Sequence, residues 1–361
     1  MISSVYIHIP FCHSICTYCD FCKFIYNNEW VNDYLNKLEL EIKDRYMDEV
    51  INTIYIGGGT PSCLKKEELD RLFNIIKIFK VSDNLEFTME CNLEDININF
   101  IKYIKEHGIN RISIGVESFD KHNLETMNRK MDYQLLEDTL NMIRDNGITN
   151  INLDLMYALP NENLKTVKTD LKKIVKLKPT HISTYSLILE DNTYLKYKNT
   201  HPINEELDYE MYNYICKYLT RHGFNHYEVS NFSIPNYQSK HNLVYWQNKE
   251  YYGFGCGASG YVSGVRYSNT RSLSKYIESD IFSTKELLSK DEIIDYHMIL
   301  GLRLLKGINV NEFNNLYNVD MFTRYPINAL IKYEDLIYKD GYIYINPSRI
   351  YVMNEILNKL V

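Results

Sequence analysis

Six short runs of β-branched and aromatic residues recur along the first half of the chain, separated by helical patterns. The runs are Val5–Ile9, Thr53–Ile56, Leu85–Met89, Arg111–Val116, Asn150–Leu155 and His181–Leu187. Between them, apolar residues recur at helical spacing over Trp30–Arg45, Glu67–Phe79, Ile96–His107, Tyr133–Asn146 and Leu164–Lys176. Strands that alternate with helices predict an α/β fold with a parallel sheet. Six units are too few for a closed eight-stranded barrel, which leaves a partial barrel or an open sheet.

The alternation of strands and helices stops near residue 200. A helix predicted over Glu205–His222 leads into a region rich in Gly and Tyr at 251–264, and then into helices and a hairpin with an Asp340-Gly341 turn. We expect a core over 1–200, an extension over 201–285 and a C-terminal helical domain over 286–361. Helices followed by a hairpin resemble a winged helix. The net charge of −7 favours a packing role for this domain over binding to nucleic acid.

Residues that are unusual in a hydrophobic core follow or interrupt five of the predicted strands. The first strand runs into IPFCHSICTYCDFC, and the second ends in GGGTPS, residues 57–62. The third ends in Glu90, the fourth in Glu117, and the fifth contains Asp154. Any one of these acids is more simply a helix cap or an ion-pair partner. In βα folds, however, function gathers at the carboxyl ends of the strands, so the set predicts one site built across the sheet.

The cysteine-rich loop allows three interpretations. Cys12, Cys16 and Cys19 have the spacing C-x3-C-x2-C, which is tight enough to bring three thiolates to one metal centre. An iron–sulfur cluster usually has four cysteine ligands, so three would leave one iron open to a small molecule. Zinc would need a fourth ligand. The candidates for that fourth ligand are Cys22, His8 and His13.

A disulfide is the third interpretation of the cysteines, and the N-terminal sequence disfavours it. No secretory signal precedes the first strand, so we expect a cytoplasmic protein in a reducing compartment. The chain also lacks an apolar run of about 18 residues, so we expect no transmembrane helix.

The cysteine loop, the glycine run and the acids together resemble those of radical S-adenosylmethionine enzymes. More narrowly, the chain is similar to the oxygen-independent coproporphyrinogen III oxidase family, and within it to a branch of haem chaperones. The resembling stretches run in order from residue 5 to about 308: VYIHIPFCHSICTYCDF, IYIGGGTPS, NRISIGVESF, NLDLMYALP, HISTYSLILEDNT, YEVSNFS, HNLVYW and LGLRLLKGI. The resemblance implies a partial (β/α)6 TIM-like barrel of the radical SAM type and a mostly helical, winged-helix-like C-terminal domain.

The resemblance also implies roles for individual residues. Cys12, Cys16 and Cys19 would ligate a [4Fe–4S] cluster whose open iron takes the amino and carboxylate groups of S-adenosylmethionine. The residues implied to lie beside the cluster or to contact this cofactor are Tyr6, Tyr18, Gly58, Gly59, Thr60, Glu90, Glu117, Arg129 and Asp154. Two positions depart from the family, with Glu117 where Gln is usual and Leu93 where Pro is common. The carboxylate of Glu117 adds a charge that Arg129 could balance.

The loop around the cluster separates the two branches of the family. The oxidases have a longer segment before the cluster and a further cysteine two residues after the third, whereas this chain has Phe21 there. The resemblance therefore favours a haem chaperone. The alternative is an oxidase that decarboxylates the propionate side chains of coproporphyrinogen. Cys22, one residue further along, is not expected to be a ligand.

The stretch HNLVYW is the sequence that the resemblance associates with haem. It implies that His241 ligates the iron and that Tyr245 and Trp246 pack on the macrocycle. Without the resemblance, His241 would more simply be a hydrogen-bonded core histidine. We expect haem as the cargo and haem-requiring proteins as its acceptors, with membrane respiratory enzymes among the candidates, which would add a peripheral membrane location. The sequence leaves open a homodimer, covalent attachment of haem and productive cleavage of S-adenosylmethionine.

Overall fold

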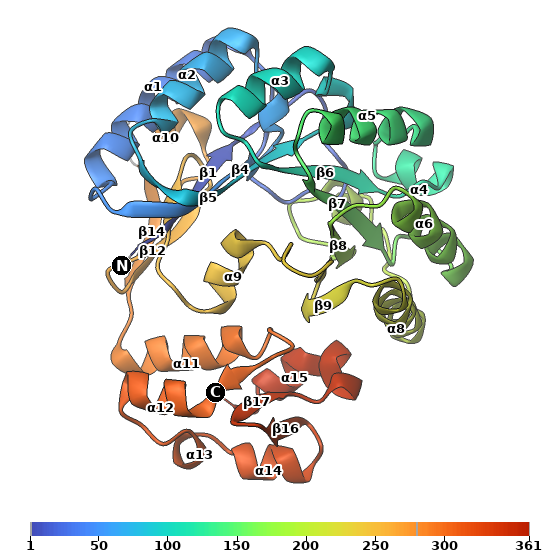
Figure 1. Cartoon of the computed structure of the whole chain (residues 1–361), viewed down its shortest axis with the longest axis vertical. Helices are drawn as coiled ribbons and strands as arrows, with labels where there is room; N and C mark the ends of the chain where they lie inside the picture. The colour runs from blue at the N-terminus through green and yellow to red at the C-terminus, as the bar shows by residue number, and fades with distance from the viewer. Residues whose placement is uncertain (1, 279–280, 361) are drawn as a thin grey trace.

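The computed structural model describes residues 2–278 and 281–360. Its main sheet has the strand order β11-β1-β4-β5-β6-β7-β8-β10-β9 (Figure 1). The central strands are β1 (Ser4–Ile9), β4 (Val50–Gly58), β5 (Lys80–Cys91), β6 (Arg111–Glu117), β7 (Asn150–Tyr157) and β8 (His181–Ser186). All of these neighbours pair in parallel. This arrangement confirms the predicted partial (β/α)6 barrel.

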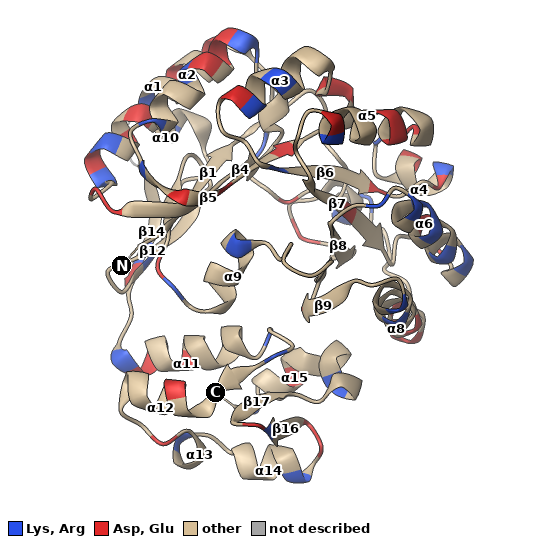
Figure 2. Ribbon diagram, in the orientation of Figure 1, with Lys and Arg blue, Asp and Glu red and all other residues tan. Residues whose placement is uncertain are grey.

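Helices cover the outer face of the sheet (Figure 1). They are α1 (Asn28–Arg45), α2 (Lys66–Ile76), α3 (Ile98–Glu106), α4 (Lys121–Thr126), α5 (Tyr133–Asp145), α6 (Leu164–Lys176) and α8 (Glu205–Arg221). In α1, the apolar residues Leu35, Leu38 and Ile42 are fully buried, as their helical spacing predicts. Charged residues of both signs lie on these outer helices, and lysines predominate on α6 (Figure 2).

The segment after residue 205 extends the sheet at both edges. Strand β11 (Tyr252–Phe254) pairs in parallel with β1, and β10 (Asn231–Ser233) pairs antiparallel with β8 and with β9 (Asn225–Glu228). The chain continues through a small antiparallel sheet: β12 (Ser259–Val262), β13 (Val265–Asn269) and β14 (Phe282–Leu287), with α10 (Leu273–Glu278) between the last two strands. The extension therefore completes the edges of the barrel sheet.

The short helix α9 (Lys240–Trp246) lies between the sheet and the C-terminal helices (Figure 1). The carboxylate of Glu86 in β5 accepts hydrogen bonds from the backbone N–H groups of Lys240 and His241, each at 3.0 Å. Because these N–H groups belong to the first turn of α9, a negative charge there satisfies them and stabilises the helix. This contact fixes α9 to the sheet.

The C-terminal domain is mostly helical, as predicted. Its helices are α11 (Lys290–Gly301), α12 (Val310–Tyr317), α13 (Met321–Arg324), α14 (Ile327–Lys332) and α15 (Met353–Leu357). They pack with an antiparallel sheet of β15 (Ile308–Asn309), β16 (Leu336–Lys339) and β17 (Tyr342–Ile345). Asp340 and Gly341 have φ of 52° and 81°, as the predicted hairpin turn requires. Within the described parts of the chain, no helix is long and apolar enough to span a membrane.

Candidate functional site

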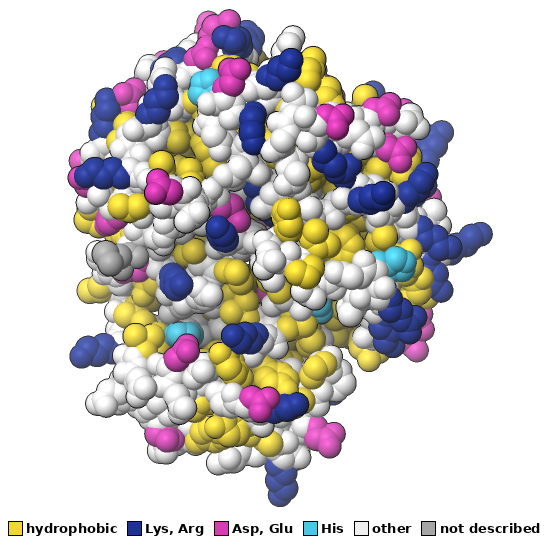
Figure 3. Space-filling model, viewed as in Figure 1, with side chains coloured by type: hydrophobic (Ala, Val, Ile, Leu, Met, Phe, Trp, Pro, Cys, Tyr) yellow, Lys and Arg dark blue, Asp and Glu magenta, His cyan; other side chains and the backbone are white. Residues whose placement is uncertain are grey.

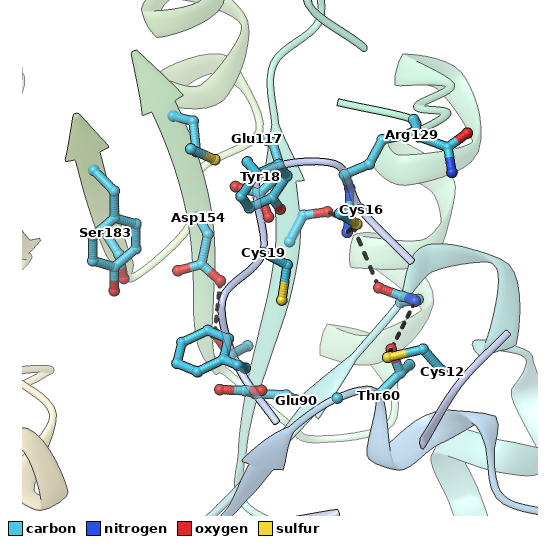
Figure 4. Close-up of a pocket in the computed structure, with 18 of the residues that line it drawn as sticks. Cys12, Cys16, Tyr18, Cys19, Thr60, Glu90, Glu117, Arg129, Asp154 and Ser183 are labelled. Carbon is cyan, nitrogen blue, oxygen red and sulfur yellow. Dashed lines mark hydrogen bonds between the residues drawn. The ribbon is translucent and has the colours of Figure 1, made fainter. Parts of the chain in front are cut away.

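A cavity of about 1360 Å³ opens at the carboxyl ends of the central strands. Its lining includes nearly all of the residues proposed for the cluster and the cofactor: Cys12, Cys16, Tyr18, Cys19, Gly58, Gly59, Thr60, Glu90, Glu117, Arg129 and Asp154. Figure 4 draws the three cysteines together with these acids. Tyr6 and His241 lie outside the lining. The barrel thus gathers into one space residues that are up to 142 positions apart in the sequence.

The cysteine loop is closed at its base and anchored at its middle. Strand β2 (Phe11–Cys12) pairs with β3 (Phe24–Ile25), which brings the two ends of the loop together. The Thr17 hydroxyl donates a hydrogen bond of 2.7 Å to the carbonyl of Thr126. Thr60 Oγ1 lies 3.5 Å from Cys12 Sγ, and Arg129 Nη1 lies 3.5 Å from Cys16 Sγ. The barrel wall therefore supplies hydrogen-bond donors to two of the three sulfurs.

The thiols fit a multi-iron cluster better than a single ion. Burial raises the pKa of Cys12 to about 11 and also raises the pKa of Cys19, so a bound metal would be needed to hold them as thiolates. No three His, Cys, Asp or Glu side chains of the described residues converge closely enough to hold one ion. In a [4Fe–4S] cluster each thiolate binds a different iron, so the sulfurs need only face a common space.

The candidates for a fourth zinc ligand all have other partners. The ring of His8 is hydrogen-bonded through Nδ1 to Tyr6 Oη (2.9 Å) and through Nε2 to the carbonyl of Cys22 (2.7 Å). His13 Nε2 lies 3.5 Å from Asp95 Oδ1, and Cys22 Sγ lies 3.6 Å from Cys256 Sγ. Tyr6 lies outside the cavity lining, where its hydroxyl is hydrogen-bonded to the ring of His8.

The glycine run brings the backbone of β4 to the edge of the cavity. Gly58 has a φ of +112°, and its amide donates to Glu90 Oε2 at 3.0 Å. The amides of Gly59 and Thr60 donate to the carbonyls of Ile9 (2.9 Å) and Phe11 (2.7 Å). Since all three N–H groups are already donated, contact with the ammonium group of an amino acid would use the carbonyl oxygens of this run.

Glu90 and Asp154 place two acids on adjacent parts of the cavity wall. Glu90 accepts hydrogen bonds from the Tyr55 hydroxyl (2.8 Å) and from Gly58, while burial, together with the charge of Asp154, raises its pKa to about 7. Asp154 accepts from Asn152 Nδ2 (2.8 Å) and Ser113 Oγ (3.3 Å), and burial raises its pKa as well. A cation or a set of hydroxyl groups in the cavity would offset this desolvation.

Glu117 and Arg129 are side chains of opposite charge that interact in the site. Burial raises the pKa of Glu117 to about 7, although the Arg129 guanidinium opposes this shift. Burial by itself would lower the pKa of Arg129, but the charge of Glu117 together with Tyr18 and Cys16 outweighs it, so the pKa is raised. Glu117 has a φ of 63°, a conformation that is uncommon outside glycine and clusters at functional sites. Arg129 thus balances the charge of Glu117, as the sequence suggested.

Sequence reasoning missed two residues that line the cavity. Asn92 Nδ2 donates to Thr60 Oγ1 at 3.2 Å, and its Oδ1 accepts from Arg129 Nη2 at 3.4 Å, so its amide joins two cofactor candidates. Arg111 is 2% exposed, and its Nε has no hydrogen-bond partner among the described residues. An arginine at the start of a strand that is otherwise buried was the available signal for Arg111.

The side chain of His241 is not free to bind iron in this structure. Its side chain is 1% exposed and lies against β4 and β5, away from solvent. Nδ1 is 2.8 Å from Thr53 Oγ1, and Nε2 is 2.7 Å from Tyr245 Oη, so both ring nitrogens are engaged. Burial, reinforced by the charge of Arg111, lowers its pKa to about 3. The expected haem contact through Nε2 would require the hydrogen bond to Tyr245 to break and the ring to become accessible.

Comparison with known proteins defines the class. The model of the Radical SAM superfamily matches residues 6–174, which span β1 to α6 and the whole cysteine loop. The structure of coproporphyrinogen III oxidase (HemN) from Escherichia coli superposes with a TM-score of 0.86 at 20% identity, over 99% of this chain and 89% of that one. A likeness at this identity shows a common fold. The family model and the fold together identify residues 6–174 as a Radical SAM superfamily domain.

Relatives that match nearly the full chain identify the family more closely. The heme chaperone HemW of Lactococcus lactis subsp. lactis is 39% identical over 94% of this chain and 91% of its own length. The heme chaperone HemW of Bacillus subtilis is 36% identical over 98% of this chain and 95% of its own length. The chain belongs to the HemW family.

Proposed function

We propose that this protein is a haem chaperone, which binds haem and passes it to acceptor haemoproteins. The HemW relatives, which match nearly the full chain, carry this proposal. The cavity supports the radical SAM part of the proposal, because it is lined by the three candidate cluster ligands and by all of the cofactor candidates except Tyr6.

In this proposal, Cys12, Cys16 and Cys19 would hold a [4Fe–4S] cluster, with S-adenosylmethionine beside it in the cavity. When bound, this pair would supply one-electron chemistry. The other residues of the cavity would bind and orient the cofactor. Carbonyl oxygens of Gly58 and Gly59 would be available to the ammonium group, while the acids Glu90, Glu117 and Asp154 would accept hydrogen bonds from ribose hydroxyls or offset the sulfonium charge. Arg129 limits the net negative charge of the wall.

The test is an anaerobic comparison of two activities on the full chain with its cluster reconstituted. One arm titrates haem and then measures its transfer to an acceptor apoprotein, such as a membrane respiratory enzyme. The other arm supplies coproporphyrinogen III and measures protoporphyrinogen formation. Haem binding and transfer without turnover support the proposal, whereas turnover of coproporphyrinogen would establish the oxidase alternative instead.

The role of His241 as an iron ligand remains a prediction from the resemblance. It requires the buried ring to become accessible and Nε2 to lose its hydrogen bond to Tyr245. A variant His241→Gln, which keeps a hydrogen-bonding side chain but cannot replace imidazole at iron, should lose the histidine signature of bound haem if the prediction holds.

A further inference from the structure

A second cavity, of about 770 Å³, lies between α9 and the C-terminal domain. It is bounded by the end of α9, the end of α11, the 304–309 segment and α12. This volume lies within the usual range for cavities that hold organic ligands. Figure 3 shows hydrophobic side chains along the seam between the barrel and the C-terminal helices. None of the residues assigned to the cluster or to S-adenosylmethionine lines it.

The walls of this cavity are aromatic and aliphatic. Leu243 and Trp246 of α9 line it together with Phe313 and Leu316 of α12. The side chain of Leu316 is 65% exposed, which leaves an apolar rim at the cavity mouth. Trp246 belongs to the HNLVYW stretch, so the helix that buries His241 in the barrel presents its last residue to this second space. Apolar walls with an aromatic side chain suit a flat macrocycle.

His297 of α11 lines the same cavity and is suited to bind a metal. Its Nδ1 is 2.8 Å from the Tyr317 hydroxyl, which fixes the ring, and Nε2 has no hydrogen-bond partner within residues 2–278 and 281–360. The ring packs edge-on against Phe313 at a centroid distance of 5.3 Å. Burial lowers the pKa of His297, which favours the neutral imidazole that binds iron. Metal-binding histidines commonly have one nitrogen held in this way.

Cationic groups lie at the cavity as well. Lys249 and Lys306 line it, and Lys306 Nζ lies 4.7 Å from the ring centroid of Tyr342. Glu312 is the acid among the lining residues, so the two lysines outnumber it. Lysine side chains at the edge of an apolar slot could pair with the carboxylates of a ligand.

We propose that haem binds in this second cavity, with Nε2 of His297 as an axial ligand of the iron and Lys249 and Lys306 facing the propionates. The inference rests on the haem-chaperone function proposed above. It places the cargo on the opposite side of α9 from the buried ring of His241, in a site whose imidazole is available without rearrangement. A site between two parts of the chain could release its ligand by a small separation of those parts.

The test is a titration of ferric haem into the full-length protein, followed by absorbance in the Soret region and by electron paramagnetic resonance. His297→Ala should weaken haem binding at least tenfold and remove the histidine signature, and added imidazole should restore that signature. His222→Ala is the matched control, because His222 is exposed and its ring, among the described residues, is hydrogen-bonded to the carbonyl of Tyr218 in α8 alone. Tyr317→Phe should weaken binding to a smaller degree, since it frees His297 without removing it.

Three results would overturn the inference, and they are distinguishable. If the wild-type protein binds haem and His297→Ala retains its affinity and spectrum, the site is elsewhere while the chaperone function stands. Loss of the spectrum in His241→Gln but not in His297→Ala would move the ligand to the barrel. If the wild-type protein binds no haem, the proposed function itself fails.

Discussion

The Sγ atom of Cys22 lies 3.6 Å from the Sγ atom of Cys256, in a buried contact between the cysteine loop and the chain after β11. The hydrogen bond between the two thiols lowers the pKa of Cys22 and raises that of Cys256. Cys22 Sγ also lies 3.5 Å from the carbonyl of Arg271. The fourth thiol of the loop therefore has its partners outside the large cavity, whose lining does not include it.

We predict that Cys22→Ser keeps the [4Fe–4S] cluster, because serine can still hydrogen-bond to Cys256 and to the carbonyl of Arg271. Cys16→Ser should lose the cluster, since Cys16 lines the cavity and is one of the three proposed ligands. Iron and sulfide content and the visible absorbance of anaerobically reconstituted protein measure both effects. Cluster loss in Cys22→Ser equal to that in Cys16→Ser would show that Cys22 is a ligand.

Glu117 and its replacements test the cofactor wall. Glu117→Gln keeps a hydrogen-bond acceptor of the same size, and we expect S-adenosylmethionine binding to change only a few-fold. Glu117→Ala removes the acceptor and leaves Arg129 without its counter-charge, so binding should weaken about tenfold or more, the cost of a lost hydrogen bond to a charged group. Equilibrium binding of S-adenosylmethionine to the two reconstituted variants and to the wild-type protein measures these effects. Equal affinities for all three proteins would remove Glu117 from the cofactor site.

Gly58 is needed for close packing as well as for its backbone conformation. A Cβ atom there would lie 2.5 Å from ring atoms of His8, whose two nitrogens are both hydrogen-bonded. Gly223 also has a positive φ, of 88°, but a Cβ there meets no atom within 4 Å. Gly223→Ala should cost about 1–2 kcal/mol through backbone strain alone, and Gly58→Ala clearly more. Urea unfolding measures the difference, and equal losses would contradict the packing role.

The buried ring of His241 should make stability depend on pH. Its pKa is about 3 in the folded protein against 6.5 in the unfolded chain, so the unfolded chain takes up the proton first as the pH falls. The folded state should therefore lose about 1.5 kcal/mol between pH 6.5 and pH 5 through this residue alone. His241→Gln should remove that part of the loss in urea unfolding of cluster-free protein, and His222→Gln should not. A pH dependence that is unchanged in His241→Gln would refute the assignment.

Local patterns in the sequence predicted most of the barrel and much of the candidate site. The helix bounds over Leu164–Lys176 are reproduced in full, because amphipathic spacing and an Asn163 cap are local signals. The cysteines, glycines and acids were found because each follows or interrupts a strand. Asn92 was missed since its importance comes from contacts with Thr60 and Arg129.

Contacts between distant segments could not be predicted in this way. The pairing of β11 with β1 joins residues nearly 250 positions apart, and the hydrophobic periodicity of the sequence does not predict it. The two hydrogen bonds of His241 likewise depend on where α9 meets β4. The same limit applies to His297, whose position beside Tyr317 and Trp246 becomes visible only when α11 and α12 pack against the barrel.

The parallel pairing of β1 with β11 has a consequence for synthesis on the ribosome. β1 is made before β11, so one of its two edges stays unpaired until residues 252–254 have emerged. During that interval the strand that leads into the cysteine loop is an exposed edge, open to wrong pairing with other chains. Completion of the sheet beside the loop therefore depends on a segment that is translated nearly 250 residues after it.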